Sequence, residues 1–388
     1  MIDLPKKEVD VLVIGSGAAG AISAWDSAVK GLDVSMIGVG TPATEMSSGC
    51  IRFNDDRSVP EGLGLDRGDL EDAFSRAERF LIDEMKTSGL KMEGARRDQG
   101  RYYRCHGTIV PENIVQGPTS SGGLDRIEGE RICVIGFEDR TEFDHRLFAK
   151  ALAQRSDLRV EHIAVGTTNG VLRNSSVDDL LDMFVDAAGS ASGEVVFVPP
   201  FISLKDIDRW EELEKRSGRK FAEPVMDLGM PGARLRDALI SSASRAGVSI
   251  TNGASIVGMS ISKGSLNEVT VRSGHRLQHI ECGAAVFCGG GLVGGGLGVS
   301  GKDVIDPLGL FDVRYLREGD GIDILARASS GGIRTGPGLE AIVDGEKVRN
   351  LFVAGASLPG MNIVEGNGIG DAMATALLAS KAATEASR

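Results

Sequence analysis

The stretch Val11–Lys30, VLVIGSGAAGAISAWDSAVK, contains the residues that decide the fold. It begins with four apolar residues, a pattern typical of a strand buried on both faces of a parallel sheet. A GSGAAG turn over 15–20 follows, then a helix of small residues that ends at Gly31, and a second buried strand over Val34–Ile37. Strand, glycine-rich turn, helix and strand in this order predict a dinucleotide-binding βαβ unit.

The turn is expected to bind the pyrophosphate of the dinucleotide. Its glycines let the backbone turn tightly and bring the phosphates against the amides at the helix N-terminus. At Gly17 we expect a branched side chain to fill the phosphate space and to be disfavoured by the dihedral angles of the turn. The residues predicted to bind a cofactor here are Gly15, Ser16, Gly17, Ala18, Ala19 and Gly20.

One expected residue is missing from this unit. The second strand normally ends in an Asp or Glu that binds the ribose hydroxyls, but this chain has Gly38 there. We therefore expect the adenosine end of a dinucleotide to be held by backbone groups and the helix dipole, or not to be held at all.

Composition narrows the class of protein. With 388 residues the chain has room for two to three domains, and its 53 glycines suit close contact between backbone and a large cofactor. A net charge of -12 argues against nucleic acid and against a basic, lipid-attracted face. Five cysteines without a CxxC pair indicate reduced, intracellular thiols, and no metal site is predicted.

No targeting or membrane-spanning segment is predicted. The start of the chain lacks an apolar signal core, and the most apolar later run, Ala284–Val299, is interrupted by glycines and too short for a span. We therefore expect a cytoplasmic protein, with docking onto the inner face of the cell membrane through a partner as an open option.

The pattern of strands and helices divides the chain into three parts. Residues 1–125 and 231–388 are predicted to form the two segments of the dinucleotide-binding domain, and residues 126–230 an inserted α/β domain. The insertion alternates strand, helix, strand, helix and strand between Arg131 and Leu204, which predicts a small parallel layer of its own. It carries no nucleophile motif, so we expect it to cover a site or to bind a partner.

The order of elements resembles the large group of two-segment FAD flavoproteins that includes fumarate reductase and glutathione reductase-like enzymes. The matching features are Val257, a strand that ends at Gly289 and Gly290, and a final strand over Leu351–Gly355 that leads to a glycine-started helix. The acid that usually follows the last glycine of that strand is missing as well, because this chain has Ala356 there.

Within this group the chain resembles the family of the B subunit of anaerobic glycerol-3-phosphate dehydrogenase, which also lacks the first acid. The segments that carry the resemblance are Met46–Cys50, Arg131–Phe137, Gly289–Val299, Ile305–Leu310 and the tail from Gly331 to Ser380. The resemblance implies oxidation of sn-glycerol 3-phosphate to dihydroxyacetone phosphate, with electrons passing towards membrane quinone. It also implies two partners: a catalytic flavoprotein subunit and an iron–sulfur, membrane-associated subunit.

The resemblance implies the cofactor and its site. FAD is the expected cofactor, and FMN, which has no adenosine, is the alternative that the missing ribose acid leaves open. The amides and dipole at the start of the last helix would stabilise negative charge on a reduced flavin. Beyond the first turn, the predicted cofactor-binding residues are Ser47, Ser48, Gly49, Val257, Gly289, Gly290, Gly355, Gly366, Gly368 and Ile369.

No motif assigns catalytic residues. A phosphate-bearing substrate calls for arginines, and the candidates are Arg52, Arg104, Arg314 and Arg334. His106 is a candidate general base, although a lone histidine in a loop is more often structural. Two other functions stay open: a stand-alone FAD oxidoreductase resembling fumarate reductase, and a scaffold subunit that has lost its flavin.

Overall fold

The computed structural model describes residues 6–53, 63–139, 142–167, 175–301, 303–315, 331–361 and 368–388 of the chain. The chain separates into two compact units. Unit 1 comprises Met1–Thr44, Arg52–Glu84 and Leu239–Arg388, and unit 2 comprises Glu45–Ile51 and Met85–Ala238. The domain boundaries drawn from the sequence, after residues 125 and 230, stay a prediction.

Unit 1 is built on a sheet whose centre is parallel, as the sequence predicts. Its parallel strands are β1 (Lys6–Ile14), β2 (Val34–Gly38), β11 (Ser249–Asn252), β14 (Arg276–Phe287) and β20 (Glu346–Val353). β1 lies between β2 and β14, so that Val11 pairs with Val34 on one side and with Ala284 on the other. Val11 is completely buried, because a central parallel strand is covered on both faces.

An antiparallel part completes this sheet. β12 (Ala254–Ser262), β13 (Ser265–Ser273) and β14 form a meander, and β19 (Glu340–Val343) pairs with β20. Two further strand pairs are short: β15 (Gly298–Ser300) with β16 (Asp303–Ile305), and β17 (Val313–Tyr315) with β18 (Gly331–Ile333).

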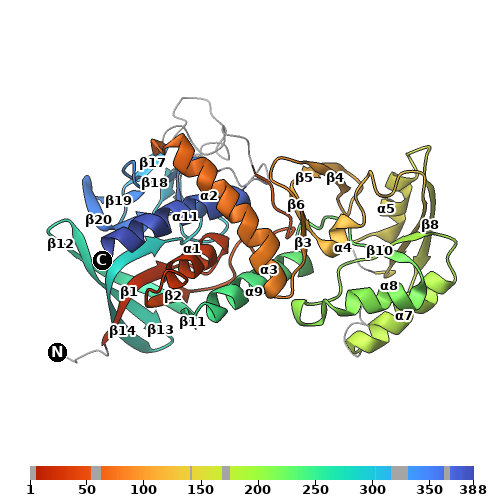
Figure 1. Ribbon diagram of the computed structural model, residues 1–388, viewed down its shortest axis with the longest axis horizontal. Coiled ribbons are helices and arrows are strands. Elements are labelled where there is room, and N and C mark those ends of the chain that lie inside the picture. Colours follow the sequence, from red (N-terminus) through yellow and green to blue (C-terminus); the bar gives the residue numbers. More distant parts are fainter. Residues whose placement is uncertain are drawn as a thin grey trace. The chain divides into compact units, whose positions relative to one another are not determined.

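Three helices of unit 1 lie side by side (Figure 1): α1 (Ala18–Ala28), α2 (Arg67–Arg79) and α11 (Gly368–Ala386). α2 continues into the π-helical segment η2 (Phe80–Glu84), and a 3-10 turn, η4 (Gly355–Ser357), follows β20. The buried carboxylate of Asp26 in α1 joins the three helices, because it accepts hydrogen bonds from Arg76 of α2 and Ser380 of α11. Lys30 adds an ion pair to the same carboxylate at 2.6 Å.

Unit 2 contains a four-stranded, fully parallel sheet in the order β10-β9-β7-β8. Its strands are β7 (Arg131–Gly136), β8 (Arg159–Ala164), β9 (Val195–Phe197) and β10 (Lys220–Ala222), and its longer helices are α5 (His145–Leu152), α7 (Val177–Gly189) and α8 (Arg209–Ser217). The parallel layer predicted over 131–204 is confirmed, and β10 adds a strand that the sequence pattern does not reveal.

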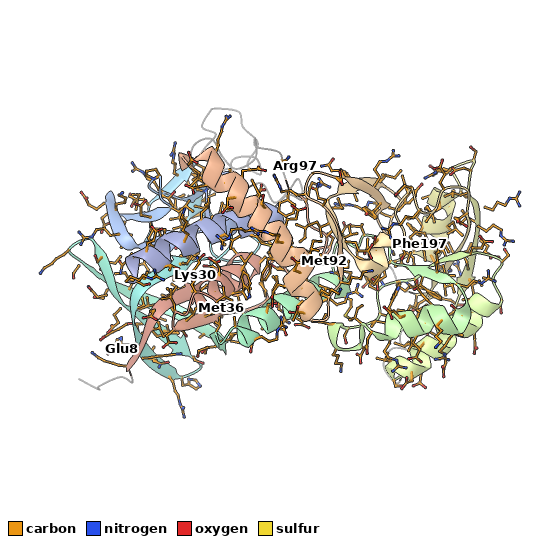
Figure 2. All side chains as sticks on the ribbon, in the orientation of Figure 1. Glu8, Lys30, Met36, Met92, Arg97 and Phe197 are labelled. Carbon is orange, nitrogen blue, oxygen red and sulfur yellow. The ribbon has the colours of Figure 1, made fainter. Side chains whose placement is uncertain are left out.

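Alternate residues of β7 face two different cores. Cys133 and Ile135 belong to a cluster with α7, whereas Ile132 and Val134 belong to a cluster with α5. Figure 2 labels Phe197, a fully buried member of the second cluster. Both faces of this sheet are therefore covered at its centre, which explains why β7 and β9 consist almost entirely of apolar residues.

The remaining elements around unit 2 are mostly short. They are α3 (Met85–Thr87), β3 (Met92–Gly94), β4 (Gly100–Tyr103), β5 (Ile109–Glu112), β6 (Ile114–Gln116), α4 (Gly117–Ser120), η3 (Leu204–Asp206) and the first part of α9 (Met230–Arg245), whose residues from Leu239 on belong to unit 1. Arg234 of α9 and Glu223 form an ion pair whose side chains are both completely buried. Among the described residues, no helix combines the length and apolar character needed to span a membrane.

Candidate cofactor site

The turn between β1 and α1 is packed so tightly that two of its glycines cannot be replaced by a residue with a side chain. Gly15 has φ +118°, and a Cβ on it would lie 2.0 Å from the carbonyl oxygen of Cys288. A Cβ on Gly20 would lie 1.8 Å from the carbonyl oxygen of Gly15. The backbone around this turn therefore approaches more closely than any side chain permits.

Gly17 is less tightly packed than Gly15 and Gly20. It caps α1 with φ −78° and ψ −171°, an extended conformation that any residue adopts. A Cβ there would make only ordinary contacts, 3.4 Å from Thr44 Oγ1 and 3.6 Å from Pro42 Cβ. The predicted dihedral restriction at Gly17 is therefore wrong, and only the argument from ligand space still applies to it.

A threonine that the sequence does not single out contacts the start of α1. The buried Thr44 accepts a hydrogen bond from the Ala18 amide at 2.9 Å. Helix geometry leaves the next two amides, of Ala19 and Gly20, without acceptors inside the helix. These amides and the positive end of the helix dipole are the groups that could bind an anion. A single threonine in a loop carries no sequence signal for this position.

The missing acid at the end of β2 has a steric explanation. A Cβ on Gly38 would lie 2.3 Å from Ser16 Oγ and 2.7 Å from Ser16 Cβ. A side chain at position 38 and the serine in the turn therefore exclude each other. This end of β2 offers backbone groups in place of a carboxylate.

A second group of glycines lies beside the turn. Gly290 has φ +86°, and its carbonyl oxygen accepts a hydrogen bond from Ser357 Oγ at 3.0 Å. Gly355 also approaches the turn, since a Cβ on it would lie 2.7 Å from Ala19 Cβ. The structure thus gathers the first turn, Gly289, Gly290 and Gly355 at the carboxyl ends of β1, β14 and β20.

The start of the last helix lies in the same unit. Gly368 and Ile369 are the first two residues of α11, and Gly366 lies outside the described residues. Gly370 packs closely, because a Cβ on it would lie 2.6 Å from the carbonyl oxygen of Arg52. The amides of this helix start are the second group of backbone donors in unit 1.

Four other predicted residues have different surroundings. Ser47, Ser48 and Gly49 belong to unit 2, where the Gly49 amide donates to Ser47 Oγ at 3.2 Å. Val257 lies in unit 1 at a bulge of β12, with its side chain exposed. The Gly49 carbonyl oxygen also accepts from Gln116 Nε2 at 3.3 Å, and these contacts do not by themselves identify a ligand site.

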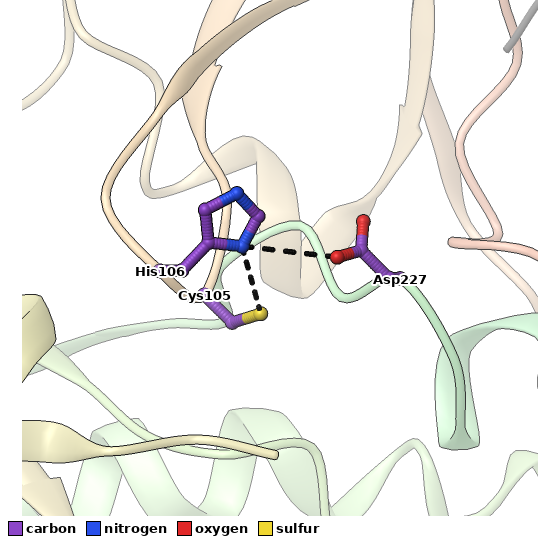
Figure 3. A group of neighbouring side chains, drawn as sticks. All are labelled: Cys105, His106 and Asp227. Carbon is purple, nitrogen blue, oxygen red and sulfur yellow. Dashed lines mark hydrogen bonds and ion pairs between the residues drawn. The ribbon is translucent and has the colours of Figure 1, made fainter.

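The candidate catalytic residues are divided between the two units. Arg52, Arg314 and Arg334 belong to unit 1, and Arg334 and Arg314 are exposed. Arg104 and His106 belong to unit 2, where Arg104 Nη1 donates to Asp227 Oδ1 at 2.5 Å. Asp227 also lies beside His106 (Figure 3). The guanidinium of Arg104 is therefore already engaged by a carboxylate of the same chain.

The residues of the first turn fit the diphosphate of a dinucleotide. A Cβ on Gly17 would meet Thr44 Oγ1 and Pro42 Cβ only at van der Waals distance, and the start of α1 supplies donors next to it. Gly15 and Gly20 bring backbone close on the other sides. Close approach of backbone and free amides at a helix start are what such a ligand requires.

Fold and turn together define the class: a two-segment, dinucleotide-binding protein with an inserted α/β layer. The model of the FAD binding domain family matches residues 10–292, and the chain belongs to this family. The match supports FAD as the cofactor and gives no support to the alternative, FMN.

Individual proteins give more distant similarities. The chain is 24% identical to a probable B subunit of the anaerobic glycerol-3-phosphate dehydrogenase of Halobacterium salinarum, over 98% of both chains. Among solved structures, 3-ketosteroid delta1-dehydrogenase from Sterolibacterium denitrificans matches with a TM-score of 0.48, 10% identity, and coverage of 97% of this chain and 99% of that one. E. coli quinol fumarate reductase matches with a TM-score of 0.46, 10% identity, and coverage of 99% and 71%. These two structural likenesses carry no argument about function.

Proposed function

We propose that this chain is the B subunit, a flavoprotein, of a quinone-linked, anaerobic glycerol-3-phosphate dehydrogenase. It would take part in oxidising sn-glycerol 3-phosphate to dihydroxyacetone phosphate. The observation that carries the proposal is the end-to-end similarity to the Halobacterium salinarum protein, combined with a glycine turn that fits a dinucleotide. In this proposal the protein works on the cytoplasmic side and reaches the membrane through a partner.

The proposal assigns the flavin to backbone groups of unit 1. Gly15–Gly20 would hold the diphosphate, Gly38 would face the adenosine end, and Gly289, Gly290 and Gly355 would line the remaining length. FAD, when bound, supplies the electron acceptor. The start of α11, at Gly368, would place its amides and positive dipole end where a reduced flavin carries negative charge. Ser47, Ser48, Gly49, Val257 and Ile369 are proposed as further contacts.

Substrate chemistry is assigned to a complex rather than to this chain alone. Oxidation of a secondary alcohol needs a base for the hydroxyl proton, and a phosphate group needs a cation. Arg104, which lies two residues from His106, is held by Asp227 at 2.5 Å. We therefore propose that a catalytic flavoprotein subunit supplies these groups, that an iron–sulfur subunit carries electrons towards quinone, and that the 131–204 layer serves for docking.

The test begins with the purified, full-length chain. Its absorbance spectrum and chromatography of the acid-released cofactor should show non-covalently bound FAD. With glycerol 3-phosphate and an artificial acceptor, the chain alone should show little turnover, and addition of the catalytic partner should restore it. Robust turnover by the chain alone would instead support a stand-alone oxidoreductase, and a chain that takes up neither FAD nor FMN would support a scaffold.

A further inference from the structure

Three side chains of unit 2 converge at a place that the proposed flavin site does not use. Cys105 and His106 lie in the turn between β4 and β5, and Asp227 follows β10 (Figure 3). His106 Nδ1 lies 3.8 Å from Cys105 Sγ and 3.7 Å from Asp227 Oδ2. All three ligand atoms lie within 4.8 Å of one another.

These separations are close to those of a tetrahedral zinc site. Zn–S bonds of about 2.3 Å and Zn–N or Zn–O bonds of about 2.1 Å place neighbouring ligand atoms roughly 3.4 to 3.6 Å apart. The two separations from His106 Nδ1 exceed this range by only a few tenths of an ångström, and the third, between Cys105 Sγ and the Asp227 carboxylate, is at most 4.8 Å.

The outer atoms of two of these side chains are also fixed. Asp227 Oδ1 accepts from Arg104, which leaves Oδ2 to face His106. His106 Nε2 lies 3.0 Å from Thr108 Oγ1, which leaves Nδ1 to face the other two ligands. Outer hydrogen bonds of this kind orient the ligands in metal sites.

Backbone pairing holds the two segments in register. The Cys105 amide donates to the carbonyl oxygen of Val225 at 3.0 Å, and the Val225 amide donates to that of Tyr103 at 2.9 Å. The turn is closed by a hydrogen bond from the Arg104 amide to the Thr108 carbonyl oxygen at 2.7 Å. Backbone hydrogen bonds therefore fix the positions of the segments that carry Cys105, His106 and Asp227.

The same geometry argues against a nucleophilic relay. A thiol, imidazole and carboxylate relay needs the thiol on one ring nitrogen and the carboxylate on the other. Here both Cys105 and Asp227 approach Nδ1 of His106 (Figure 3). His106 Nε2 is directed to Thr108 Oγ1. Three donor atoms that cluster at the same side of the imidazole suit a cation and do not suit proton transfer.

We propose that Cys105, His106 and Asp227 form a binding site for a divalent zinc-class ion. A thiolate and an imidazole favour zinc over magnesium or calcium. The three protein ligands leave a fourth position for water, and the half-exposed side chains of His106 and Asp227 give that position access to solvent. Binding would cross-link the β4–β5 turn to the segment after β10 and would occupy the nitrogen that a general base needs.

Binding at this site is linked to a proton. An ordinary thiol is mostly protonated at neutral pH, and only the thiolate binds zinc. The S–H bond therefore breaks as the S–Zn bond forms, and the proton passes to buffer. No electron is transferred in this step.

The test is a calorimetric titration of the untagged, full-length flavoprotein with zinc chloride, in two buffers that differ in ionisation enthalpy. We expect one zinc per chain with release of a proton. Cys105→Ser and Asp227→Asn, both close in size to the native residues, should each weaken binding on the order of 100-fold or more. Cys282→Ser is the matched control, because Cys282 is also a half-buried free thiol but lies in unit 1.

Alkylation mapped by mass spectrometry gives a second measurement. Zinc should protect Cys105 from alkylation while leaving Cys282 as reactive as before. Absence of stoichiometric binding, or equal binding by the two variants and the native chain, would overturn the proposal. Unchanged circular dichroism and flavin content of the variants would exclude loss of folding as the cause of their weaker zinc binding.

Discussion

The parallel centre of the unit 1 sheet and the parallel sheet of unit 2 share their strand direction but differ at their carboxyl ends. In unit 1, Gly15 follows β1 and faces the backbone of Cys288, with no room for a side chain between them. In unit 2, β7 ends at Gly136, where a Cβ would meet His145 Cβ at 2.6 Å, and the buried Phe137 follows. The carboxyl ends of the strands are packed against backbone in unit 1 and against side chains in unit 2. A parallel sheet becomes a binding site through the residues at its carboxyl ends, and the sheet alone is not sufficient.

The largest effect is expected at the backbone contact of unit 1. Gly15→Ala adds a Cβ that collides with the Cys288 carbonyl oxygen, at a φ of +118° that side chains rarely adopt. Strain and overpacking together should lower the free energy of unfolding by about 4 kcal/mol. Urea unfolding measures it. Gly31→Ala is the control, because Gly31 has φ +86° but nothing within 4 Å, and should cost only about 1 to 2 kcal/mol.

In unit 2 the corresponding weak point is a side-chain pair. Glu223→Gln leaves the completely buried Arg234 without its carboxylate, and should lower the free energy of unfolding by about 3 kcal/mol. Thermal unfolding followed by circular dichroism measures this loss of stability. Glu212→Gln breaks the exposed pair with Arg209 and should cost less than about 1 kcal/mol. Equal losses in the two variants would show that burial does not set the difference.

Gly17→Val separates binding from folding within the first turn. Because the backbone of Gly17 is extended and a Cβ there would make only van der Waals contacts, the free energy of unfolding should change by less than about 1 kcal/mol. The affinity for FAD should fall about 100-fold, which corresponds to roughly 2.7 kcal/mol. Flavin content and equilibrium titration of the apoprotein give the measurement. A full complement of tightly bound flavin would mean that the diphosphate does not lie at this turn.

The smallest effect is a pH dependence that belongs to unit 2. Burial, followed by the nearby His162 and Arg146, lowers the pKa of His145 below its ordinary value of 6.5. The unfolded chain therefore takes up a proton first as the pH falls through about 6.5, and stability decreases by at most about 1.4 kcal/mol per pH unit. Urea unfolding at pH 7.5 and 5.5 should show this loss.

A His145→Gln variant should show a smaller loss between the same two pH values, because it has no imidazole to protonate. His275→Gln, in an exposed turn, is the control and should keep the dependence of the native chain. The same loss in all three proteins would assign the pH effect to other groups.

The fold can be predicted because its signals are local. The apolar run before Gly15, the glycines of the turn and the alternation over 131–204 each lie within a few consecutive residues, and the structure confirms the elements that they predict. β10 cannot be predicted in this way, because Lys220–Ala222 is only three residues long and no period can be recognised in it.

The details of the sites depend on contacts between distant segments. Gly15 is required because Cys288 returns beside it, and Thr44 matters only because its loop reaches the start of α1. Arg104 and Asp227 are 123 residues apart, and the pairing of Val225 with the β4–β5 turn brings them together. No rule based on sequence spacing can connect residues so far apart. The sequence therefore does not link Asp227 to Cys105 and His106, and it predicts no metal site there.

The carboxylate of Asp26 sets an order of events during synthesis of the chain. Two of its partners, Lys30 and Arg76, follow after 4 and 50 residues, but the third, Ser380, follows after 354. A ribosome that adds about 5 to 20 residues per second needs roughly 20 to 70 s to make that third partner. Unit 2, which ends at Ala238, has left the ribosome by then. The first helix of unit 1, α1, still lacks its contact with the last helix, α11. The first turn to be translated is thus among the last parts of the protein to mature, and a nascent chain that stops short of Ser380 leaves a buried charge incompletely bonded.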